Sequence, residues 1–124
     1  FAVRNSGATA VTEGAGDHCC EYMTGGKVVI LGSTGRNIGA GMTGGIAFIL
    51  DENNDLDKKV NKEIVSIHKI TSSNQENILL EIIKEYRAKT NSLKAANIIE
   101  NWSHLKSNFK IIVPPSEEEM LGIK

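Results

Sequence analysis

The sequence predicts a mainly β fold: a right-handed parallel β-helix of about two and a half coils, followed by a C-terminal helical tail. Three observations predict it. A glycine-containing phrase occurs three times in the first 51 residues, at offsets of 18 and then 19 residues. Eleven of the twelve glycines lie within residues 7–45. After Asp51 the apolar residues instead recur at the spacing of amphipathic helices.

Each copy of the phrase, at residues 6–14, 24–32 and 43–51, reads as a turn followed by a short strand. Paired small residues permit a positive φ or a close backbone approach, and the apolar or β-branched residues that follow suit a strand. A unit of 18 or 19 residues is too short for a strand, a helix and a return. It fits three short strands and three turns, which is one coil. We expect the turns to depend on Gly7, Gly25, Gly26, Gly32, Gly35, Gly39, Gly41, Gly44 and Gly45.

Superposing the three copies predicts columns of like residues stacked on one another. Successive strand residues face opposite sides, so the columns fall into two sets. The interior set is Ala10, Val28, Ala47 and Thr12, Ile30, Ile49. The exterior set is Thr9, Lys27, Ile46 and Glu13, Leu31, Leu50, and an outer apolar column of Val11, Val29 and Phe48 is expected to lie beneath the helices. The preceding turns also align, Cys20 with Gly39 and Met23 with Met42. The general handedness of parallel crossovers predicts a right-handed coil.

Composition and net charge exclude several classes of function. The 124 residues allow one domain at most, which we divide into coils over 1–51 and a loop and helical tail over 52–124 that packs on them. The net charge is −1, with no basic field to hold nucleic acid or an anionic membrane. No apolar run of spanning length and no signal peptide is present. Two adjacent cysteines indicate a reducing compartment, either the cytoplasm or an organellar stroma.

The tail reads as a polar loop over 51–55, an extended segment over 63–70, two helices and a strand. A capping box at 73–76 opens a helix to about Lys89, with its apolar face at Ile78, Leu79, Ile82, Ile83 and Tyr86. Residues 90–92 break it, and a second helix runs to about Leu105. We expect this helix to turn Leu93, Ala96, Ile99 and Trp102 toward the core. Residues 109–113 form a strand that Pro114 and Pro115 end, and a last turn is capped at Ser116.

The literal motifs of the coil resemble one known family. They are residues 1–8 (FAVRNSGA), residues 16–26 (GDHCCEYMTGG) and the run Gly32-x-x-Gly35-Arg36-Asn37-x-Gly39-Ala40-Gly41-Met42-x-Gly44-Gly45. Together they are similar to the C-terminal GXGXG domain of the glutamate synthase large subunit. The tail also resembles the closing segment of that family. The resemblance as a whole covers essentially the entire chain.

The resemblance implies a right-handed β-helix of which this chain is the C-terminal part. The parent enzyme makes glutamate from glutamine and 2-oxoglutarate, with an amidotransferase domain, an FMN-bearing barrel and an iron–sulfur cluster. None of these catalytic parts of the parent enzyme maps onto these residues. We therefore expect no catalytic residue, no cofactor-binding residue and no metal-binding residue in this chain. The resemblance implies a scaffold whose partners are the amidotransferase and FMN-barrel domains, inactive as a chain by itself although part of an oxidoreductase. A free-standing GXGXG subunit that assembles with separate catalytic chains is the alternative.

Two other sites compete with the scaffold hypothesis. Gly32, Gly35 and Gly39 follow an apolar run, as in a nucleotide-binding strand–loop–helix. However, only fourteen residues separate Leu31 from Ile46 and six are glycine, which costs a crossover helix about 1 kcal/mol each. The stretch His18-Cys19-Cys20 suggests a metal, but adjacent strand cysteines point to opposite faces and no second ligand pair exists. Cys20 therefore reads as a small core residue, and Asp17-His18 as a turn rather than an acid–base pair.

Overall fold

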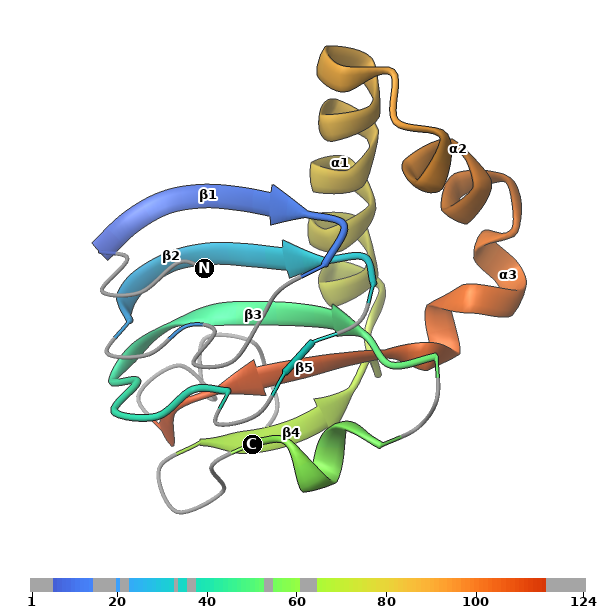
Figure 1. Ribbon diagram of the computed structural model, residues 1–124. Helices are drawn as coiled ribbons and strands as arrows, with labels where there is room; N and C mark the ends of the chain where they lie inside the picture. The colour runs from blue at the N-terminus through green and yellow to red at the C-terminus, as the bar shows by residue number, and fades with distance from the viewer. Residues whose placement is uncertain are drawn as a thin grey trace.

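Five strands form one mixed sheet in the order β1-β2-β3-β5-β4 (Figure 1). The computed structural model describes residues 6–14, 20, 23–32, 34–35, 38–52, 55–60 and 65–115. The strands are β1 (Ser6–Thr12), β2 (Thr24–Ile30), β3 (Gly44–Leu50), β4 (Ser66–Lys69) and β5 (Phe109–Val113). The helices are α1 (Ser73–Thr90), α2 (Leu93–Glu100) and α3 (Trp102–Leu105), with short 3₁₀ turns η1 (Leu56–Lys58) and η2 (Lys106–Asn108).

The three repeated segments pair as parallel neighbours in the predicted register. Ala10 lies opposite Val28 and Val28 opposite Ala47, while Thr12, Ile30 and Ile49 form the next interior column. The outer column of Val11, Val29 and Phe48 is aligned in the same way. The columns predicted from the repeats are therefore confirmed along these strands.

The β-helix prediction is wrong. The second edge of β3 is taken by β5, which runs antiparallel to it, with Ala47 opposite Ile112 and Leu50 opposite Phe109. A strand that returns from the tail in the opposite direction is not a further coil. The sheet is also open, since β1 and β4 lie at its two edges. Within the described residues each repeat contributes a single strand rather than three, and the molecule is a small α/β domain in which the tail supplies strands as well as helices.

The register shifts by one residue where each parallel strand begins. The shift lies between Ser6 and Thr9 in β1, and again between Thr24 and Lys27 in β2. An extra residue on one strand of a pair is a β-bulge, which bends the strand. Gly26 and Gly45 adopt φ values of 86° and 85° at equivalent places in β2 and β3. The repeated bulge therefore uses the left-handed conformations that glycine adopts without steric cost.

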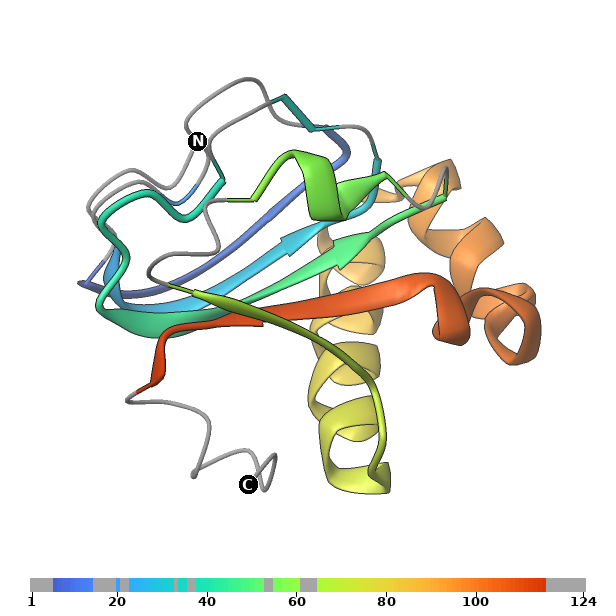
Figure 2. The same cartoon turned by 90° about the horizontal axis from the view of Figure 1, so that it is seen from below.

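The sheet is covered on both faces (Figure 2). On one face Val28, Ile30, Ala47 and Ile49 pack with Met23, Ile38 and Met42, which precede strands β2 and β3, and with Leu56, Val60 and Val65, which follow β3. On the other face Val29, Leu31 and Phe48 pack beneath Leu79 and Ile83 of α1, with Val11 partly buried at the margin. The prediction that helices cover the outer apolar column is confirmed. Helix α1 crosses the strands on this face, as Figure 1 shows.

The tail elements correct several predictions in detail. Ser72, not Ser73, caps α1, and its Oγ accepts a hydrogen bond from the Gln75 N–H. The extended segment is a strand over 66–69, and the strand predicted over 109–113 has those bounds. The second helix breaks at Asn101, which separates α2 from α3. The expected turn at Ser116 lies outside the described residues.

The core-facing side of α2 was also predicted wrongly in part. Ala95 and Ile98 are the fully buried residues of this helix, whereas Leu93 is 87% exposed. Ile99 and Trp102 pack only at the margin of the core, with Trp102 against Phe109 at a ring-centroid distance of 5.7 Å.

Candidate functional site

The predicted turn glycines lie along the strand starts and the connection between β2 and β3. Gly7, Gly25, Gly26, Gly44 and Gly45 lie in the parallel strands, Gly32 follows β2, and Gly35, Gly39 and Gly41 lie before β3. A phosphate-binding loop needs glycines so that a ligand can approach the backbone. Here a Cβ atom at Gly32 would meet the Glu13 carbonyl oxygen, and one at Gly44 would meet that of Thr24. At Gly45 it would lie 2.9 Å from the Gly25 carbonyl oxygen. Backbone atoms of the preceding repeat therefore occupy the space beside these glycines, so a flavin or nucleotide phosphate does not fit there.

The turns before β2 and β3 share one geometry. The Met23 N–H donates to the Cys20 carbonyl at 3.2 Å, and the Met42 N–H donates to the Gly39 carbonyl at 3.0 Å. Gly39 has φ 78° and its counterpart Cys20 has φ 61°, a left-handed conformation that is uncommon for a residue with a side chain. Cys20 is fully buried, which confirms it as a core residue.

The helix that the nucleotide-binding hypothesis requires is not found among the described residues between Leu31 and Ile46. The described residues between Leu31 and Ile46, which are 32, 34–35 and 38–45, contain turns and an isolated bridge between Ile38 and Val60 but no helix. The loop of a dinucleotide fold places the pyrophosphate at the N-terminus of such a helix. His18, Cys19, Asp17, Arg36 and Asn37 lie outside the described residues.

The carboxyl ends of the parallel strands bring together polar residues that sequence reasoning missed. Glu13, directly after β1, accepts a hydrogen bond from the Tyr86 hydroxyl at 2.9 Å and another from the Ser92 hydroxyl at 2.8 Å. Ser92 is also the N-cap of α2, since its Oγ accepts from the Ala95 N–H at 3.1 Å. We call these three residues the Glu13 clasp. It joins the end of the first repeat to α1 and to the start of α2.

The clasp changes the acidity of its phenol. Desolvation raises the pKa of Tyr86 above its ordinary value of 10.0, and the hydrogen bond to Glu13 and its negative charge raise that pKa further. On the same helix the ammonium of Lys89 hydrogen-bonds to Glu85, the residue before Tyr86, and lowers the pKa of that carboxyl. In each case the hydrogen-bond partner of the titrating group is another side chain of the same chain.

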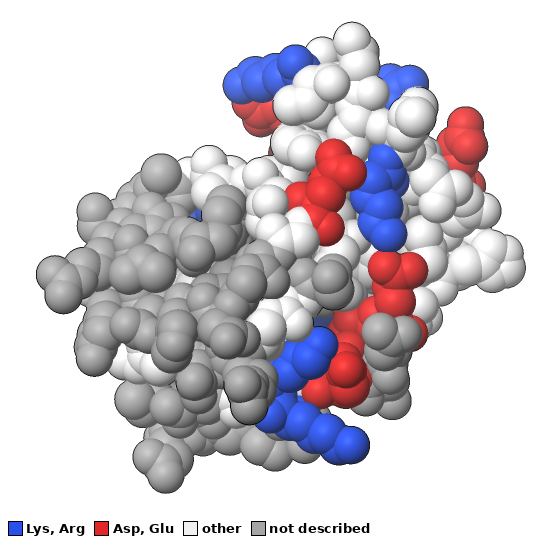
Figure 3. Space-filling model, viewed as in Figure 1, with Lys and Arg blue, Asp and Glu red and all other residues white. Residues whose placement is uncertain are grey.

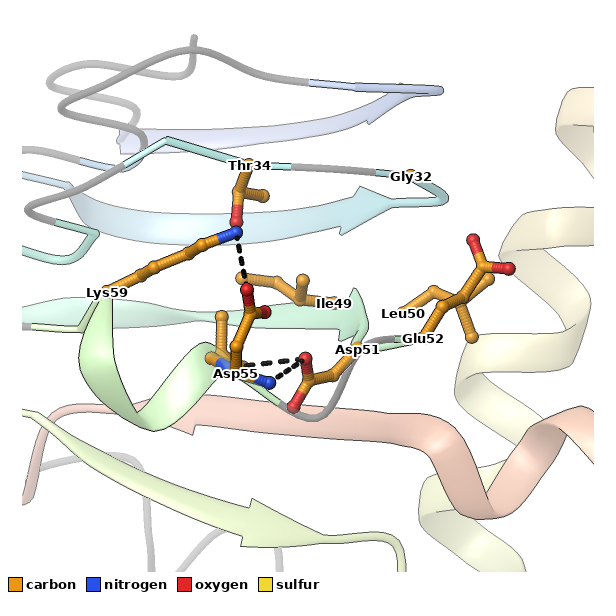
Figure 4. A pocket seen from close by; sticks show the side chains of 9 residues that line it. Gly32, Thr34, Ile49, Leu50, Asp51, Glu52, Asp55 and Lys59 are labelled. Carbon is orange, nitrogen blue, oxygen red and sulfur yellow. Dashed lines mark hydrogen bonds and ion pairs between the residues drawn. The ribbon is translucent and has the colours of Figure 1, made fainter.

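A hollow opens at the end of β3, beside the loop to η1 (Figure 4). Asp51 Oδ1 accepts hydrogen bonds from the backbone N–H groups of Asp55 and Leu56, at 3.0 and 3.2 Å. Lys59 pairs with Asp55 at 3.4 Å, and Glu52 pairs with Lys94 at 3.1 Å. Each of these carboxylates therefore holds the loop or a helix in place, which is a structural role.

The described surface carries charges of both signs. Figure 3 shows basic and acidic side chains next to one another over the helical side of the molecule. Across the described ranges, no group of three or more His, Cys, Asp or Glu side chains could hold a metal ion. None of the helices in the part of the chain that is described is both long and apolar enough to cross a membrane.

Comparison with known proteins agrees with the literal motifs. The chain is 58% identical over 119 residues to ferredoxin-dependent glutamate synthase 2, chloroplastic, of Arabidopsis thaliana, which is 96% of this chain and 7% of the relative. It is 55% identical over 118 residues to ferredoxin-dependent glutamate synthase of Antithamnion sp., or 95% of this chain and 8% of the relative. It is 48% identical over 121 residues to the NADH glutamate synthase of Schizosaccharomyces pombe, or 98% and 6%.

The chain thus spans less than a tenth of the length of these relatives. The model of the family described as "GXGXG motif" matches residues 1–115, which include all three repeats and the tail through β5. On this match, the chain belongs to the GXGXG motif family.

Proposed function

We propose that this chain is the GXGXG region of a glutamate synthase and serves as a scaffold that braces the amidotransferase and FMN-barrel domains, without a catalytic residue of its own. One observation carries the proposal: 96% of the chain aligns at 58% identity with a ferredoxin-dependent glutamate synthase. Two plant relatives, from Arabidopsis thaliana and Spinacia oleracea, are named as chloroplastic, which supports an organellar stroma as the compartment of this chain, with the cytoplasm as the alternative.

The packing supports a structural role. The glycine positions are closed by neighbouring backbone, and the carboxylates at the strand ends hydrogen-bond within the chain. The same region is shared by relatives named for different electron donors, ferredoxin and NADH. A region that determined the donor would differ in kind between them, so we infer that electron entry and FMN reduction belong to other parts of the enzyme.

The first experiment tests the chain by itself. The purified chain is examined for flavin and iron–sulfur absorbance, and titrated calorimetrically with FMN and with NADH. The scaffold hypothesis expects no stoichiometric cofactor and no binding heat. One bound cofactor per chain would overturn it.

The second experiment tests the full-length glutamate synthase that carries this region. Glu13→Gln and Asp51→Asn remove charge from the strand-end carboxylates and keep their shape. The scaffold hypothesis expects kcat within about twofold of the parent enzyme, because under it neither residue contacts substrate. A loss of tenfold or more in kcat at unchanged thermal stability would show a catalytic role instead.

A further inference from the structure

We draw no further inference here: the strongest candidate, the hollow between the edge strand β1 and the last turns of α1, lined by Val11, Ile82 and Tyr86, carries nothing because none of the described residues shows what covers it.

Discussion

The hydroxyl of Tyr86 donates a 2.9 Å hydrogen bond to Glu13 Oε2, across 73 residues of sequence. Glu13 ends the first repeat, and Tyr86 lies in the last turns of α1. The same carboxylate oxygen accepts from Ser92, the N-cap of α2. One side chain therefore links α1 and the start of α2 to the edge strand of the sheet.

Removing the donor of this hydrogen bond or neutralising its acceptor should destabilise the fold. Tyr86→Phe and Glu13→Gln are each expected to lower the free energy of unfolding by about 0.5–1.5 kcal/mol, because the bond is partly exposed. Denaturant unfolding measures this. The double variant should cost less than the sum of the two, since the residues act through one contact. Full additivity would show that they do not interact, and Lys84→Ala serves as an exposed control on the same helix.

The stability of the chain should fall at alkaline pH in a way that depends on Tyr86. Its pKa is raised in the folded state above 10.0, first by desolvation and then by Glu13. The stabilisation is therefore complete below the unfolded pKa and is lost as the pH rises through the higher folded pKa. Denaturation at a series of pH values from about 9 to 11 should show a steeper decline than in Tyr86→Phe. Parallel curves would contradict the raised pKa.

Gly45 should not tolerate a side chain. Its φ of 85° is in the left-handed region, and a Cβ would lie 2.9 Å from the Gly25 carbonyl oxygen and 2.5 Å from the Met23 methyl group. We expect Gly45→Val to cost at least about 2–4 kcal/mol, through backbone strain and displacement of the preceding repeat. Lys27→Ala, at an exposed position of β2, should change stability by less than about 0.5 kcal/mol in the same denaturant measurement. Equal stabilities would rule out the stacked-bulge geometry.

Asp51 should be needed for the loop that follows β3. It is 8% exposed and accepts two backbone hydrogen bonds, from Asp55 and Leu56. Asp51→Ala is expected to cost about 1–3 kcal/mol, because one buried and one part-buried donor lose their acceptor. Amide hydrogen exchange at Asp55 and Leu56 should accelerate in this variant. In Glu52→Ala, which removes only an exposed ion pair to Lys94, the two amides should exchange as in the parent.

The three parallel strands could be predicted from the sequence because stacked repeats place equivalent residues at a nearly constant spacing along the chain. Once Lys27 and Ile46 are aligned, every later residue of the three strands follows, and the pairing of Val11 with Val29 and of Val29 with Phe48 needs no further information. The coverage of that column by α1 was also predictable, since an apolar outer column requires a cover and the tail carries an amphipathic helix. The one-residue shift at Gly25 and Gly44 was not, because a bulge changes the register without changing the apolar pattern.

The contacts of Glu13 at the end of β1 could not be predicted from the repeat pattern. Nothing in the residues around Glu13 marks it as the partner of Tyr86 and Ser92, although Ser92 at a helix start is a recognisable cap. Leu93 was assigned to the core because its spacing to Ala96 and Ile99 fits one helical face. The break at Asn101 divides that face, and α2 buries Ala95 and Ile98 instead.

By itself the sequence determined the family, the three strands and their register beyond the bulges, because those follow from literal motifs and from a period that repeats along the chain. Only the tertiary structure decided whether the repeats close into coils or open into a sheet. The residues of β3 have the same alternation in either case, and the difference lies in β5, which pairs Ile112 with Ala47, 65 positions earlier in the sequence. A contact between segments so far apart depends on the free energy of the whole assembly, and no local pattern contains it.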